Sequence, residues 1–113
     1  MYRGTLSGQL VIEDLPGIGV HVSKELDLLD STLEHYIQYP KTLGSGSGAE
    51  LPLGDVTSAK VIYLEGDNAF DLKINNATEY IRVKNLLTFG ASATSLYAAD
   101  VAGGTNIQVI IAG

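Results

Sequence analysis

Short runs of alternating apolar and polar residues, separated by Gly, Pro, Asn or Asp, occupy most of this chain. The clearest alternation covers residues 70–75, where Phe70, Leu72 and Ile74 are separated by polar residues. Successive side chains of a strand point to opposite faces, so this pattern places one face of a strand on a core. On this basis we expect strands within residues 6–12, 18–28, 57–65, 70–75, 80–83, 86–89, 94–98 and 107–112.

One segment, residues 32–39, fits two structures. Leu33, Tyr36 and Ile37 have the spacing of a helical face, whereas Leu33, Ile37 and Tyr39 share the parity of one strand face. The β propensity of Tyr and Ile favours the strand, and Pro40 ends the segment in either case.

Turn-forming residues separate the expected strands at 14–17, 66–68, 75–77 and 103–104. Gly, Pro, Asn and Asp favour turns because each fits a backbone conformation or a local hydrogen bond that a turn requires. Eight or nine short strands at this spacing, with no long helical pattern between them, are typical of sandwiches and barrels. The sequence therefore predicts a single all-β domain over residues 1–113.

The last expected strand, residues 107–112, is apolar at nearly every position. An uncovered strand of this kind would be an adhesive edge, so it belongs inside a sheet or against a neighbouring subunit. We therefore take its apolar residues as candidate interface contacts: Ile107, Val109, Ile110 and Ile111.

Composition narrows the functional classes. A chain of 113 residues folds as one domain with a surface of roughly 6,000 Å². The formal charge of −6 argues against a nucleic-acid partner, and no apolar run is long enough for a membrane span or a signal peptide. With 45% hydrophobic and only 18% charged residues, part of the apolar surface is expected to lie between subunits of a homo-oligomer.

No residue pattern predicts catalysis, a metal site or a cofactor. The chain has no Cys, its two His residues lie apart, and its Ser residues lack a nucleophile-elbow context. The clustered carboxylates are expected to form a solvated face, and the Asp and Asn residues at 67–71 to serve turns. The candidates considered were His21, His35, Glu25, Asp27, Asp30, Glu34, Asp67, Asn68, Asp71, Ser45 and Ser47.

A flexible Gly-Ser loop is expected at residues 44–48. Tyr36 and Tyr39 come shortly before it, and an exposed tyrosine offers a large contact area with one hydroxyl. These two residues are therefore candidate contacts for another protein or for a surface glycan.

The stretch from residue 51 to 65, the segment 72–75 and the ending at 104–113 resemble small bacteriophage virion proteins, and residues 6–28 do so more loosely. The resemblance is one of strands and turns, and it implies an antiparallel β-sandwich of jelly-roll type that serves as a structural piece of a phage particle. Such pieces decorate the capsid, sit at the neck or attach to the tail and its fibres. No catalytic residue is implied.

Two functional hypotheses follow. The first is a non-enzymatic virion structural protein, made in the host cytoplasm, that forms a homo-oligomer and contacts other virion proteins. The alternative is a carbohydrate-binding β-sandwich module with a tyrosine-lined site. Neither requires nucleic acid, a membrane or a cofactor.

Overall fold

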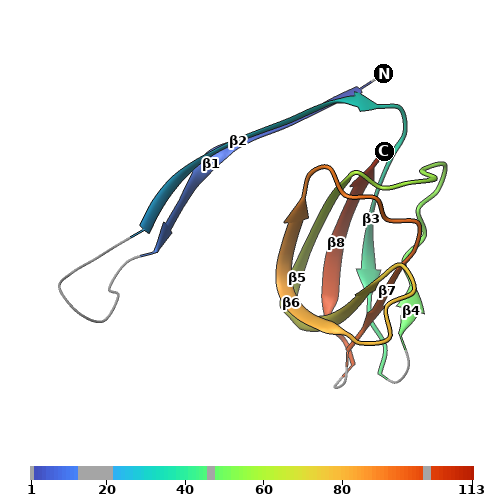
Figure 1. Cartoon of the computed structure of the whole chain (residues 1–113). Coiled ribbons are helices and arrows are strands. Elements are labelled where there is room, and N and C mark those ends of the chain that lie inside the picture. Colours follow the sequence, from blue (N-terminus) through green and yellow to red (C-terminus); the bar gives the residue numbers. More distant parts are fainter. Residues whose placement is uncertain (1, 13–21, 46–47, 101–102) are drawn as a thin grey trace.

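The computed structural model describes residues 2–12, 22–45, 48–100 and 103–113, and every strand pair in it is antiparallel (Figure 1). The described residues contain no helix. The predicted all-β antiparallel fold is therefore confirmed, and it is of β-sandwich type. The strands are β1 (Tyr2–Ile12), β2 (Val22–Leu33), β3 (Tyr36–Thr42), β4 (Ala49–Glu50), β5 (Val61–Ile74), β6 (Ile81–Thr88), β7 (Leu96–Ala99) and β8 (Asn106–Ala112).

The chain divides into a long hairpin and a curled sheet. β1 and β2 pair with each other and form a two-stranded arm that extends away from the rest of the molecule (Figure 1). The other six strands form the body. The surface of 7253 Å² is about a fifth larger than that of a compact chain of this size. The Cα radius of gyration is 15.8 Å, against about 13 Å for a compact chain. The excess surface and radius come from the arm.

The body is built around β5. Its strand order is β3-β8-β5-β7-β4, with β6 on the remaining side of β5. The first half of β5 pairs with β8 and the second half with β7, while β6 follows both halves. The sheet therefore curls at the middle of β5, and its two halves face each other across the core.

One apolar core lies inside this curl. Ile62, Leu64 and Ile111 come from one half of the sheet, and Leu72 and Leu96 from the other. All five are fully buried or nearly so. The alternation seen in the sequence thus marks the inward face of the body strands, as the periodicity predicts.

Some expected boundaries are wrong. The turn expected at 66–68 lies inside β5, because a bulge between Glu65 and Phe70 bends the strand without ending it. Residues 81–83 and 86–88, expected in two separate strands, likewise belong to one strand, β6. Residues 36–42 form a strand, so the strand prediction is confirmed for 36–39, but Pro40 lies inside this strand and does not end it, and Leu33 belongs to β2. The expected turn at 14–17 lies outside the described residues.

Candidate functional site

The arm is fixed to the body at its root. The rings of Tyr2 and Tyr36 meet edge to face with centroids 5.6 Å apart, and the side chain of Leu33 is buried. The backbone N–H groups of Glu34 and His35 both donate to the carbonyl of Gly113, at 3.0 and 2.8 Å. These contacts anchor the end of β2 to the chain beyond β8, so the arm leaves the body in a defined direction.

Polar side chains support the same root. The Lys60 ammonium donates to the Thr32 hydroxyl at 3.1 Å, and Thr32 in turn donates from its backbone N–H and its hydroxyl to the Asp30 carboxylate. The hydrogen bonds from the Thr32 hydroxyl and backbone hold the pKa of Asp30 below its ordinary value. Asp30 is therefore ionised at neutral pH and adds to the acidic character of β2.

The two faces of the arm differ. The register pairs Leu6 with Leu28, Gly8 with Leu26 and Leu10 with Lys24, so these residues share one face. A Cβ atom on Gly4, which has the same parity, would lie 3.2 Å from Leu33 and 3.9 Å from Val61. This face is therefore the one turned toward the body. Its apolar members are Leu6, Leu10, Ile12, Leu26 and Leu28.

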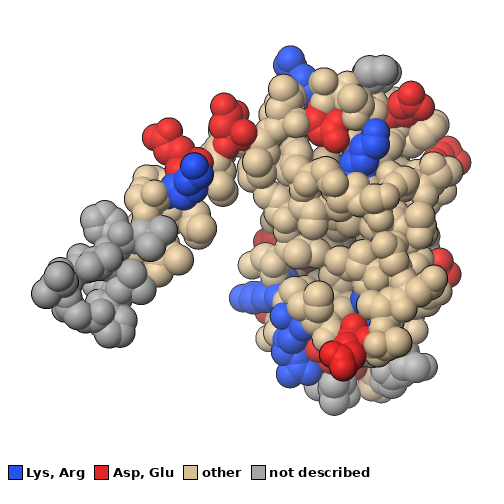
Figure 2. All heavy atoms as spheres, in the orientation of Figure 1, with Lys and Arg blue, Asp and Glu red and all other residues tan. Residues whose placement is uncertain are grey.

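The opposite face of the arm is mainly polar. It carries Glu25 opposite Gln9 and Asp27 opposite Ser7, and the amide of Gln9 donates to Ser23 at 2.6 Å. Beyond the root, the arm extends away from the body in Figure 2, with acidic groups along its middle. An isolated two-stranded hairpin is only marginally stable in water, and exposure of an apolar face to water is unfavourable. The arm therefore has the composition of a segment that packs on another surface.

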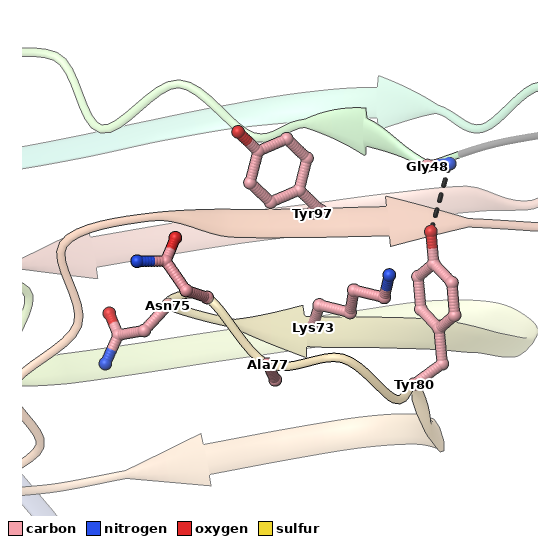
Figure 3. A pocket seen from close by; sticks show the side chains of 7 residues that line it. Gly48, Lys73, Asn75, Ala77, Tyr80 and Tyr97 are labelled. Atoms are coloured by element: carbon pink, nitrogen blue, oxygen red, sulfur yellow. Dashed lines mark hydrogen bonds between the residues drawn. The ribbon is translucent and has the colours of Figure 1, made fainter.

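A second feature is a cleft on the outside of the body. It has a volume of about 370 Å³ and is lined by residues from β5, β7, the 75–80 segment and Gly48. Figure 3 shows Lys73 between Tyr80 and Tyr97. The Lys73 ammonium lies 4.3 Å from the centre of the Tyr80 ring, and the Tyr80 hydroxyl accepts a hydrogen bond of 3.1 Å from the Gly48 N–H.

The floor of this cleft is shaped by Asn75. Its φ of 58° is in the left-handed region that Asn tolerates. Its side-chain oxygen accepts from the Thr94 N–H at 2.7 Å, and its amide donates to the Ser92 carbonyl at 3.2 Å. Asn75 thus holds the turn, while Asn76, Tyr80 and Tyr97 offer an amide and two rings to a ligand.

The last strand lies inside the sheet, between β3 and β5, the first of the two locations expected for it. Ile107, Val109 and Ile111 are buried in the core, so their side chains stabilise the body and do not present a contact surface. Ile110 has the opposite parity and is half-buried on the outer face, opposite Gln38 and Tyr63.

The two candidate tyrosines have different surroundings. Tyr36 is 64% exposed at the root of the arm. Tyr39 packs against the core, and its hydroxyl donates to the Pro52 carbonyl at 2.8 Å. Burial raises the pKa of Tyr39 to about 12, so its phenol stays protonated through the physiological range. Tyr39 therefore acts as a packing residue of the body.

The structure describes all of the polar candidates except His21 and Ser47. Within the described ranges, no three His, Cys, Asp or Glu residues lie close enough to hold a metal ion. Asp67 accepts hydrogen bonds from Asn106, and Asp71 pairs with Arg82 at 2.9 Å. His35 is exposed at the arm root, and His21 lies outside the described residues.

The sequence interpretation did not single out the arm or the cleft. The alternation in residues 6–12 and 22–28 was present, but it was assigned to the core of one sandwich. Tyr80 and Tyr97 fall in or beside strands, a position typical of core residues, so no sequence signal marks the cleft.

Protein-family models, curated proteins and solved structures were compared with the chain, and none of them matches it. The described residues also include no helix that could span a bilayer.

Proposed function

We propose that this chain is a non-enzymatic structural subunit that assembles with copies of itself through the β1–β2 arm. The observation that carries the proposal is the apolar face of the arm, which includes Leu6, Leu26 and Leu28 and whose described residues extend away from the body beyond the root (Figure 1). These three leucines are half-buried in the arm, so a partner that covers this face gains part of the about 1.5–3 kcal/mol that burial of a fully exposed leucine contributes.

We further propose that the assembly is part of a bacteriophage particle. This step rests on the resemblance of the strand and turn pattern to small virion proteins. An arm that reaches a neighbouring subunit suits such a particle, because symmetry repeats each contact and weak contacts add up.

The test replaces Leu6, Leu26 and Leu28 together by lysine. We expect the wild-type chain to form an oligomer and the triple variant to dissociate, because three charges cannot be buried in an apolar contact. The dissociation constant should rise by at least about a thousandfold. Size exclusion with light scattering over a range of protein concentrations measures the mass of each species.

A matched control places the same three charges at exposed sites of the body, away from the arm and from β6, as Gln38→Lys, Asn68→Lys and Gln108→Lys. This variant should keep the wild-type mass. A wild-type chain that remains a monomer at every concentration, or a control that dissociates as fully as the leucine variant, contradicts the role of the apolar face.

The cleft supports a second candidate function, the binding of a carbohydrate. Its volume of about 370 Å³ lies within the range of small-ligand sites, and tyrosine rings with nearby amides suit a sugar. We expect Tyr80→Ala to weaken glycan binding by about thirtyfold, as loss of a central aromatic contact does.

A glycan array with the wild-type chain, followed by titration calorimetry on a bound sugar, measures this effect. Tyr36→Ala removes an exposed tyrosine outside the cleft and is the control, for which affinity should not change. An array without any bound glycan removes this candidate and leaves the assembly proposal intact.

A further inference from the structure

The body has one edge that suits the addition of another strand. Among the described residues, β3, β4 and β6 each pair with a strand on one side only. β3 contains Pro40, which cannot donate to a ladder, and β4 has only two residues. β6 has eight residues without Pro or Gly, so it offers the longest row of backbone groups among these three edges.

The exposed apolar side chains of the body gather at the same edge. Of the large hydrophobic residues that are exposed in the described chain, Tyr80, Ile81 and Leu87 lie on β6 or directly before it. The others lie on the arm or, in the case of Tyr36, at its root. Ile81 pairs with the buried Leu72 and has the core-facing parity, yet it is 59% exposed because no further strand covers it.

The charges of this edge are the opposite of those on the arm. Arg82 and Lys84 are two residues apart and share one face of β6, and basic groups gather over the lower end of this strand in Figure 2. Glu25 and Asp27 are also two residues apart and share the polar face of β2. The Arg82 side chain is 65% exposed although it pairs with Asp71, so N–H groups remain for a second carboxylate.

We propose that the free edge of β6 receives β2 from a second copy of this chain as an added antiparallel strand, with Glu25 opposite Lys84 and Asp27 opposite Arg82. This inference rests on the proposed function and names the surface to which the arm binds. Main-chain hydrogen bonds hold an added strand, and its side chains fix the register.

The same register also matches the apolar positions. When the two ion pairs are set, Leu26 lies opposite Val83 and Leu28 lies opposite Ile81. Val83 and Ile81 have the core-facing parity of β6, and Leu26 and Leu28 belong to the apolar face of the arm. One face of the joint sheet is then apolar, and the other carries the ion pairs. A slip of the added strand by one residue would move its apolar side chains to the charged face and its carboxylates to the apolar face.

The antiparallel direction follows from the same comparison. A parallel strand could also bring Glu25 to Arg82 and Asp27 to Lys84. It would then place Lys24 opposite Ile81 and Leu28 opposite Asn85, which pairs a charge with an apolar residue and an apolar residue with an amide. Only the antiparallel register satisfies both faces.

This contact joins two different surfaces, the arm of one copy and the β6 edge of the next. Such a head-to-tail interface repeats until it closes into a ring or continues as a filament. Each subunit both gives an arm and receives one.

The test uses two charge-reversal variants of the full chain. The acceptor variant carries Arg82→Glu and Lys84→Glu, and the donor variant carries Glu25→Lys and Asp27→Lys. Each replaces two attractive cross-strand pairs by two repulsive ones, so the contact should weaken by about thirtyfold in either variant. Glu50→Lys with Asp55→Lys changes the net charge as the donor variant does, at exposed sites of the body, and should assemble as the wild type does.

Mixing the two variants provides the decisive measurement. In the mixture every contact between unlike variants again has opposite charges, so light scattering should show assemblies larger than either variant forms alone. The recovery also shows that both variants are folded. A label on one of the two variants, followed by cross-linking of the mixture, reports whether donor and acceptor variants are neighbours in the assembly.

The outcomes separate this inference from the proposed function. If the leucine variant of the arm dissociates but the acceptor variant assembles as the wild type does, the arm binds elsewhere and the β6 acceptor is overturned. A mixture that stays dissociated also overturns the register, and a wild-type chain that is always a monomer overturns both proposals.

Discussion

Replacement of Phe70 by alanine should lower the free energy of unfolding by about 3–5 kcal/mol, the largest loss expected for a single residue of this chain. Phe70 is 1% exposed and follows the bend of β5, where its ring contributes to the core between the two halves of the sheet. The alanine leaves a cavity that the surrounding strands fill only in part. Urea unfolding followed by circular dichroism gives the midpoint and slope.

Phe89 is the matched control, since it is the only other phenylalanine of the chain. It is half-buried at the arm root, where its ring approaches Gly4. Phe89→Ala should therefore cost less than half as much as Phe70→Ala. Equal losses for the two variants would show that the core is not centred on the bend.

Replacement of Gly66 by alanine is the second large effect, with an expected loss of about 1–3 kcal/mol from overpacking. A Cβ atom at this position would lie 2.6 Å from the carbonyl oxygen of Asn68 and 3.1 Å from the Phe70 ring. The nearest atom belongs to the backbone of the bulge, so relief requires the bend itself to open. The same unfolding experiment measures the loss.

Gly8→Ala is the control for this substitution. Gly8 lies in the regular part of the arm, and a Cβ atom there would meet nothing within 4 Å. Because glycine loses more backbone entropy on folding than alanine, Gly8→Ala should be neutral or slightly stabilising. A Gly66→Ala variant as stable as Gly8→Ala would mean that the bulge adjusts freely.

The sequence predicted the class of the fold because strand alternation is a local property. Phe70, Leu72 and Ile74 alternate inward along β5 as the pattern indicates. The location of the last strand inside a sheet could also be predicted from the sequence, because an apolar strand needs neighbours on both sides.

The arm could not be predicted in the same way. Leu26 and Leu28 have the same alternation whether their apolar face covers a core of the same chain or a surface of another copy. The β6 edge is equally hidden in the sequence, since Ile81 and Val83 have the pattern of any buried strand. Which edges stay free depends on strand order, and that is set by pairing between distant segments.

The pairing of β3 with β8 also affects how the chain folds during synthesis. Thr42 and Asn106, whose side chains are joined at 2.7 Å, are 64 residues apart in sequence. The arm, by contrast, pairs neighbouring segments, so it can form as soon as both its strands leave the ribosome. The sheet that contains β6 is complete only when β8 arrives. In a nascent subunit both strands of the arm are therefore available before the body can be completed, and the sheet that carries the acceptor edge is finished last.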